Sequence, residues 1–306
     1  HKAAEVYRLL ASYCSERLEG CSDLLQISKH AGVRCDSWSE ISKTSNGLKS
    51  EEDFQQAFDS SIFLATHAQS MGSNDTVLEN IHDALRYAEN YCAAHGTSDV
   101  AHRYLATVCS DWLAKDSNEK GDNLEAAKYH QKSLTAAKKA LTLSGLVKNK
   151  VFVCEKLLSQ AAFIKGSKGS GQRDILIEAS ALANEAFRES SSEGVLNVVN
   201  CQITLADDMR DSGEMAEAEQ QRNKAVMACE KAKENDDADF IKEAHAIALS
   251  DLAQSKVNRG DVASARESFE EYVQVRRQLN ESINTSESRD YLSDALLELG
   301  DFLKDS

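Results

Sequence analysis

The sequence predicts an all-α protein in which pairs of antiparallel helices follow one another as a solenoid. The 306 residues include no proline and only 14 glycines, so residues that break helices are scarce. A Leu followed eight residues later by Gly also recurs five times along the chain. The copies are Leu64 to Gly72, Leu113 to Gly121, Leu158 to Gly166, Leu205 to Gly213 and Leu252 to Gly260.

The regular spacing of these copies indicates a repeat protein. Successive glycines are 49, 45, 47 and 47 residues apart. A period of this length is typical of units that each pack mainly on their neighbours. Ala follows the Leu in four copies, whereas the third copy has Ser159. The pattern therefore predicts the fold more directly than it predicts a function.

Each Leu-to-Gly element is predicted to end the first helix of a hairpin. Glycine suits the left-handed conformation just beyond a helix end. Acidic residues follow at once, and Asp122, Glu214 and Asp261 are expected to cap the next helix. Small residues then allow the two helices to approach closely. These residues are Ala126 and Ala127, Ala216 and Ala218, and Ala263 and Ala265.

The register divides the chain into about six and a half units of 45–49 residues within one domain, 1–306. A first, irregular hairpin is expected over 2–31, followed over 32–50 by an ordered loop or a short helix packed by Trp38. The repeats cover 51–283, and a half repeat covers 285–306. The five complete hairpins are predicted at 51–96, 98–145, 147–191, 193–235 and 237–283.

Both ends of the sequence suggest a piece of a longer protein. The chain starts with His1 rather than Met, and the closing Gly of the seventh hairpin would be residue 307. Two interpretations of the unfinished hairpin remain: a capping helix at the C-terminus, or a cut within a repeat. We favour the second interpretation.

The net charge and the composition indicate which kind of partner the protein binds and in which compartment it lies. The net charge of −15 disfavours nucleic-acid binding and favours a basic or neutral protein partner. We expect no membrane association, because no apolar segment is long enough to cross a bilayer and no signal peptide is present. The eight cysteines lack zinc spacing and lie mostly on helical stretches, which predicts buried, reduced thiols in a cytoplasmic protein.

Three kinds of segment resemble functional motifs but lack residues that the chemistry needs. The segment 166–173 is rich in Gly and Ser, but its Lys is misplaced for a phosphate-binding loop and no strand precedes it. The acidic run 234–239 lacks the Gly and Glu that a calcium loop needs. The histidines and cysteines show no metal-ligand spacing. We therefore predict no catalytic residue, no metal site and no cofactor, and hence no enzyme.

The hairpins resemble the tetratricopeptide repeat (TPR) family, in its long-repeat, kinesin-light-chain-like form. The resemblance rests on Leu252-Ala253, Gly260-Asp261, Ala265 and Phe269, and on the matching residues from Leu205 to Ala218. It covers 51–306 well and the first fifty residues weakly. It implies a right-handed superhelix whose concave face is lined by the first helix of each hairpin. The period is longer than the 34 residues common in this family.

Candidate binding residues follow from the helix face opposite the Leu-Ala stripe. The resemblance implies that this face holds extended peptides, with Asn200 and Asn258 gripping the peptide backbone. Because Gln160 rather than Asn follows Lys156, we do not predict a clamp for chaperone tails. The candidates are Asp111, Lys115, Lys156, Gln160, Asn200, Ile203, Asp207, Arg210, Gln254 and Asn258.

Two functions fit this pattern. The first is a protein-interaction scaffold that binds a peptide or a helix of a partner in its concave groove. The second is a regulatory or structural arm of a larger multidomain signalling enzyme, such as a protease, a kinase or an ATPase, whose other domains would then be its partners. The full reading frame separates the two hypotheses.

Overall fold

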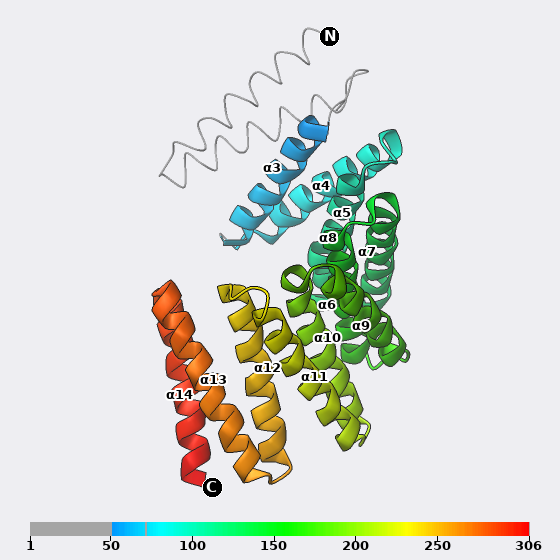
Figure 1. Cartoon of the computed structure of the whole chain (residues 1–306). Helices are drawn as coiled ribbons and strands as arrows, with labels where there is room; N and C mark the ends of the chain where they lie inside the picture. Colours follow the sequence, from blue (N-terminus) through cyan, green and yellow to red (C-terminus); the bar gives the residue numbers. More distant parts are fainter. Residues whose placement is uncertain (1–50, 71, 306) are drawn as a thin grey trace. The chain divides into compact units, whose positions relative to one another are not determined.

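The computed structural model describes residues 51–70 and 72–305, and these residues form helices and connecting loops without a β-strand. The chain divides into two compact units, His1–Ser144 and Gly145–Ser306. Figure 1 shows the helices of each unit as antiparallel pairs. The hairpin predicted over 2–31 and the loop predicted over 32–50 lie outside the described residues. A single domain over 1–306 stays a prediction.

The described part of the first unit contains two hairpins. α3 packs on α4, and α5 packs on α7. The elements are α3 (Glu51–Ser70), α4 (Asn74–Ala94), α5 (Asp99–Thr107), η1 (Val108–Ala114), α6 (Lys115–Glu119) and α7 (Asn123–Ser144).

Aromatic side chains form the core between α3, α4 and α5. Phe54 is fully buried and stacks on Tyr91, with ring centroids 4.1 Å apart. The ring of Tyr104 meets Phe54 edge-on at 5.8 Å and lies 4.3 Å from Phe58. Stacked and edge-on pairs of this kind add stabilisation beyond the area that they bury. The first described hairpin is thus joined to the next by apolar packing.

A π-helix interrupts the first helix of the 98–145 hairpin. The segment η1 connects α5 to α6 without a loop, so that 99–119 is helical throughout. Sequence periodicity did not predict it, because a π-turn changes the hydrogen-bond spacing and leaves the chain helical. It supplies Asp111 and Trp112 to the surface of this unit.

The second unit contains three hairpins and a further helix. Consecutive helices pack on one another. In addition, α10, which is the first helix of the middle hairpin, contacts the first helices of the two neighbouring hairpins, α8 and α12. The elements are α8 (Val147–Gly166), α9 (Gln172–Glu189), α10 (Ser191–Asp211), α11 (Met215–Lys233), α12 (Asp239–Asn258), α13 (Val262–Ile283) and α14 (Ser286–Asp305). This packing of hairpin on hairpin is that of a helical solenoid.

Four of the five predicted glycine turns have the expected backbone. Gly72, Gly121, Gly213 and Gly260 all have positive φ, between 72° and 84°. At Gly213 the backbone N–H bonds to the carbonyl of Arg210, and the next N–H bonds back to Met209. The other three turns repeat this pair of bonds, which is a Schellman cap. Only glycine adopts this left-handed conformation without a steric cost.

The prediction for Gly166 is wrong. Gly166 is the last residue of α8, and the same cap lies two residues further on, where Lys168 has a φ of 55°. The N–H of Lys168 bonds to the carbonyl of Lys165, and the N–H of Gly169 bonds to Ile164. The helix therefore extends beyond its predicted end, and a lysine occupies the strained position.

The predicted caps and small contacts are confirmed in part. The carboxylates of Asp122 and Asp261 accept hydrogen bonds from the first turns of the following helices. Glu214 does not cap its helix and instead pairs with Arg173. Of the predicted alanine pairs, one member each is buried against the partner helix, namely Ala126, Ala218 and Ala265. The other member of each pair is exposed, because it faces away from the hairpin contact.

The cysteines of the described residues are free thiols, as predicted. Cys109, Cys154, Cys201 and Cys229 are buried, and Cys92 is partly buried. Burial raises the pKa of Cys109, Cys154 and Cys229 to about 12. These thiols are therefore protonated and unreactive at neutral pH. In the described part of the chain, the helices are too short or too polar to span a membrane.

Candidate functional site

A pocket of about 260 Å³ lies over the ends of α10 and α12, in the second unit. We call it the Arg222 pocket, after the residue beneath it. Three sequence-predicted residues come together in its wall. Its lining consists of Arg210, Met215, Ala218, Arg222, Asp251, Gln254, Ser255, Asn258 and Arg259.

A buried guanidinium group forms the floor of this pocket. Arg222 is 2% exposed, and its Nε donates to Asp251 at 2.6 Å while its Nη2 donates to Asp207 at 2.7 Å. Arg222 belongs to the buried stripe of α11, four residues after Ala218. At this buried position α11 therefore carries a cationic side chain, whereas the neighbouring hairpins carry apolar side chains. Two carboxylates from two other helices are needed to stabilise it.

The pKa of Asp251 is set by two opposing effects. Burial raises the pKa of this carboxyl group above its usual value, and the adjacent Arg222 opposes that shift. The charged form of Asp251 thus depends on the hydrogen bond from Arg222. The floor is held rigidly, since three side chains from α10, α11 and α12 fix one another. A preorganised floor lowers the entropy that a ligand must lose on binding.

The rim of the pocket offers hydrogen-bonding groups to solvent. Gln254 and Asn258 are exposed one turn apart on α12, and the amide nitrogen of Gln254 lies 3.4 Å from the Asn258 side-chain oxygen. Arg210 pairs with Asp207 at 3.0 Å, and Arg259 pairs with Glu219. Met215 is 51% exposed and supplies an apolar surface. The rim can therefore contact both polar backbone groups and an apolar side chain.

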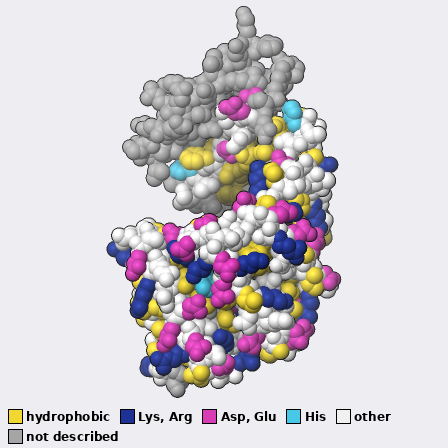
Figure 2. Space-filling model, in the orientation of Figure 1, with side chains coloured by type: hydrophobic (Ala, Val, Ile, Leu, Met, Phe, Trp, Pro, Cys, Tyr) yellow, Lys and Arg dark blue, Asp and Glu magenta, His cyan; other side chains and the backbone are white. Residues whose placement is uncertain are grey.

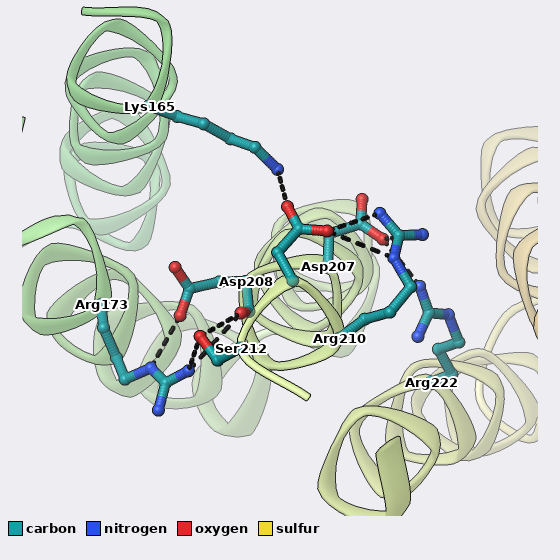
Figure 3. A network of polar contacts seen from close by, with 8 residues as sticks. Lys165, Arg173, Asp207, Asp208, Arg210, Ser212 and Arg222 are labelled. Carbon is teal, nitrogen blue, oxygen red and sulfur yellow. Dashed lines mark hydrogen bonds and ion pairs between the residues drawn. The ribbon is translucent and has the colours of Figure 1, made fainter. Parts of the chain in front are cut away.

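The C-terminal end of α10 ties the neighbouring hairpins together. Figure 3 shows Lys165, Arg173 and Arg222 converging on it from different helices. Lys165 of α8 pairs with Asp211 at 2.7 Å, and Arg173 of α9 pairs with Asp208 at 2.7 Å. Arg173 is also held by Glu214 at 2.7 Å. This end of α10 is thus fixed by partners on both sides, and so is the adjacent pocket wall.

Asp207, also predicted, belongs to the floor of the Arg222 pocket through its bond to Arg222, and the other residues predicted in the second unit lie outside the pocket. Asn200 and Ile203 are half-buried on α10 and do not line it. Gln160 is half-buried on α8. Lys156, predicted to line the groove, is only 6% exposed, and its ammonium group lies 4.9 Å from the ring centroid of Phe152. The aromatic neighbour draws the lysine side chain inward.

The first unit has its own pocket, of about 310 Å³, at the π-helix. We call it the Trp112 pocket. Asp111 and Lys115, both predicted from the sequence, line it together with Asp116 and Glu119. Its apolar side is formed by Trp112 and by residues of α4. Three carboxylates around one lysine give this pocket an acidic character.

Sequence reasoning missed the residues that shape the Arg222 pocket from α11. Arg222 was not among the predicted residues, although it occupies the buried register of Ala218 and Ala225. A charged residue at an apolar position signals a buried ion pair. Trp112 was not predicted as a lining residue, because its orientation depends on the π-helix.

Acidic and basic side chains are mixed on the visible surface of the described residues (Figure 2). On the face shown in Figure 2, described acidic and basic side chains are interspersed over the helices. A nucleic-acid footprint would instead gather lysines and arginines on one surface.

Comparisons with known proteins bear on the fold. No protein-family model and no curated protein matches the sequence. Among solved structures, BtubC (BKLC) from P. vanneervenii aligns with a TM-score of 0.59 and 14% identity, over 85% of this chain and 93% of that chain. The nuclear import adaptor Nro1 from S. pombe aligns with a TM-score of 0.54 and 13% identity, over 96% and 98%.

A third solved structure carries the repeat in its description. It is a signal transduction ATPase with numerous domains (STAND) from Pyrococcus horikoshii, with a tetratricopeptide repeat sensor. The TM-score is 0.50 at 12% identity, and the match covers 100% of this chain but 46% of that one. Similarity at these identities defines the fold. The predicted all-α solenoid of TPR-like helical hairpins is confirmed.

Proposed function

We propose that this chain is a protein-interaction scaffold and that the Arg222 pocket binds an extended segment of a protein partner. The observation that carries the proposal is the convergence of Arg210, Gln254 and Asn258 around one pocket with a preorganised floor. These three residues come from the first helices of two consecutive hairpins. Fold alone would not support this function, because one fold serves many functions.

The chemistry of the rim matches an extended peptide. The amides of Gln254 and Asn258 each carry donors and an acceptor, so they can pair with both groups of a peptide backbone. The guanidinium of Arg210 adds donors for a carbonyl or carboxylate oxygen, and Met215 adapts its shape to an apolar side chain. The overall charge of −15 favours a partner that is basic or neutral outside this segment.

A randomised peptide display library tests this proposal. The full chain is expected to select peptides, and Gln254→Ala together with Asn258→Ala should weaken their binding by about tenfold or more. The variant Gln220→Ala is the matched control, since Gln220 is exposed on α11 and does not line the pocket. Peptides that bind the double variant as tightly as the parent chain would contradict the proposal.

A second candidate function is a regulatory arm within a larger signalling protein. The alignment with the P. horikoshii STAND protein favours it, because all of this chain matches 46% of that longer one. The partner of the Arg222 pocket would then be a segment of the same polypeptide. Sequencing the complete reading frame tests this version, which requires an enzymatic domain in the same frame. A cytoplasmic location and the lack of catalytic activity stay predictions.

A further inference from the structure

Three side chains outside the Arg222 pocket meet in the second unit. They are Glu230 of α11, His245 of α12 and Glu271 of α13, each from a different helix. One ligand atom from each lies within 4.8 Å of the other two. The residues are 15 and 26 positions apart in sequence, so no motif reveals them. Packing of the helices alone creates the cluster.

His245 is the buried member of this cluster. Its side chain is 1% exposed, and its Nε2 has no hydrogen-bond partner among the described residues. The nearest carboxylate oxygen, on Glu271, lies 3.8 Å away, which is too far for a hydrogen bond. A buried polar atom without a partner is costly, and native structures seldom keep one. A ligand bound to this nitrogen would remove that cost.

The two carboxylates are placed to complete a ligand set. Glu230 and Glu271 are exposed, and their side chains can move toward Nε2 without disturbing the core.

Burial, and secondarily the charge of Lys233, lowers the pKa of His245 to about 4. The imidazole is thus neutral at physiological pH, which is the form that binds metal ions.

We propose that Glu230, His245 and Glu271 bind a divalent transition-metal ion, and that zinc fits the set best. One imidazole nitrogen and two carboxylate oxygens are accepted zinc ligands, and water would complete the coordination. Metal–ligand bonds of about 2.1 Å place ligand atoms roughly 3.4 Å apart in a tetrahedron. The observed 3.8 Å between His245 and Glu271 needs little adjustment, and rotation of Glu230 supplies the rest.

In the metal-free protein, Lys233 favours the tautomer of His245 that cannot bind a metal at Nε2. Its ammonium group lies 3.4 Å from Nδ1 of His245 and can only donate, so Nδ1 accepts and the ring proton sits on Nε2. Metal binding at Nε2 requires the other tautomer, with the proton on Nδ1. Lys233 must then turn away toward solvent. Replacing it with glutamine would instead provide an oxygen that accepts from Nδ1–H and orients the ring.

Such a site would join three consecutive helices. A metal bound to Glu230, His245 and Glu271 cross-links α11 to the hairpin formed by α12 and α13, which carries Gln254 and Asn258 on α12. Because unfolding separates these ligands, zinc would raise the stability of this part of the second unit.

Calorimetric titration of the full chain with zinc chloride, under reducing conditions, tests the inference. We expect one site whose affinity falls at least tenfold in Glu271→Gln and in Glu230→Gln. Glu267→Gln is the matched control on the same helix, because Glu267 is exposed and lies outside the cluster. Magnesium should not compete, since it prefers oxygen ligands only.

The variant Lys233→Gln separates this site from unspecific zinc binding. It should bind zinc more tightly, by about tenfold, whereas loss of a lysine elsewhere would leave the affinity unchanged. Cobalt in place of zinc should give visible absorption without a thiolate charge-transfer band. Absence of zinc binding at millimolar concentration would overturn the proposal, and so would binding that the two glutamate variants leave unchanged.

Discussion

Two buried contacts, one in each unit, differ in kind: that of the first unit is aromatic and that of the second is ionic. Between α3, α4 and α5, Phe54 stacks on Tyr91 in an apolar core. Between α10, α11 and α12, Arg222 lies buried between Asp207 and Asp251. Apolar packing depends on buried area, whereas the ionic contact depends on every partner being present. Only the second arrangement also supplies a polar floor for a binding pocket.

The largest expected effect is on the ionic interior. Arg222→Ala leaves Asp251 without its hydrogen-bonded cation and Asp207 with Arg210 alone, and it should lower the free energy of unfolding by about 3–5 kcal/mol. Hydrogen exchange measured by mass spectrometry should show the loss in α10, α11 and α12. Arg222→Met with Asp251→Asn removes the charges and keeps the volume, so it should cost clearly less. Equal losses for both variants would show that packing, not charge, decides here.

The aromatic interior should respond to loss of volume. Phe54→Ala removes a fully buried ring and should cost about 3 kcal/mol by urea denaturation. Because no charge is involved, the loss should be the same in low and high salt. A loss that changes with salt would contradict the apolar description of this core.

The second unit should also be the more sensitive to acid. His245 has a pKa lowered to about 4 by burial and by Lys233, against 6.5 when unfolded. Between these values the unfolded chain binds a proton that the folded chain does not. Stability is therefore present above pH 6.5 and falls toward pH 4, by up to about 3 kcal/mol. The raised pKa of Asp251 acts with the opposite sign at the acid end of this window.

Thermal unfolding of the full chain across pH 4–7, with a chelator present, measures this slope. In His245→Gln the fall below pH 6.5 should largely disappear, since no imidazole is left at this position to take up a proton on unfolding. An unchanged slope in the variant would assign the acid sensitivity to other groups.

The smallest effect distinguishes two turns within the second unit. Lys168 holds a left-handed conformation that Gly213 holds in the next hairpin. Lys168→Gly should therefore stabilise the chain by about 1 kcal/mol, and Gly213→Ala should destabilise it by a similar amount. Melting temperatures of the two variants, measured against the parent, should move in opposite directions. A shift of both in one direction would exclude backbone strain as the cause.

The fold could be predicted because its signals are local. The absence of proline, the Leu-to-Gly spacing and the acidic caps each act within one hairpin. The prediction was wrong at Gly166, because the helix continues to Gly166 and Lys168 adopts the left-handed conformation of the turn. It also missed the π-helix, which leaves the apolar pattern almost unchanged.

The candidate site was predicted less completely. Arg210, Gln254 and Asn258 were found because the first-helix face repeats with the helix period. Arg222 and the cluster around His245 were not, since their partners come from other helices and depend on side-chain packing. Lys156 was predicted to line the groove, but its side chain is buried beside the ring of Phe152.

The π-helix at Val108–Ala114 has a consequence for how this repeat array changes in length. It lies in the longest interval between turn glycines, 49 residues from Gly72 to Gly121. A wider helical turn accommodates an extra residue without opening a loop. The array can thus absorb an insertion inside a helix and rotate the side chains that follow. Deleting one residue there would return the segment to an α-helix and re-aim Lys115, giving the Trp112 pocket a new lining.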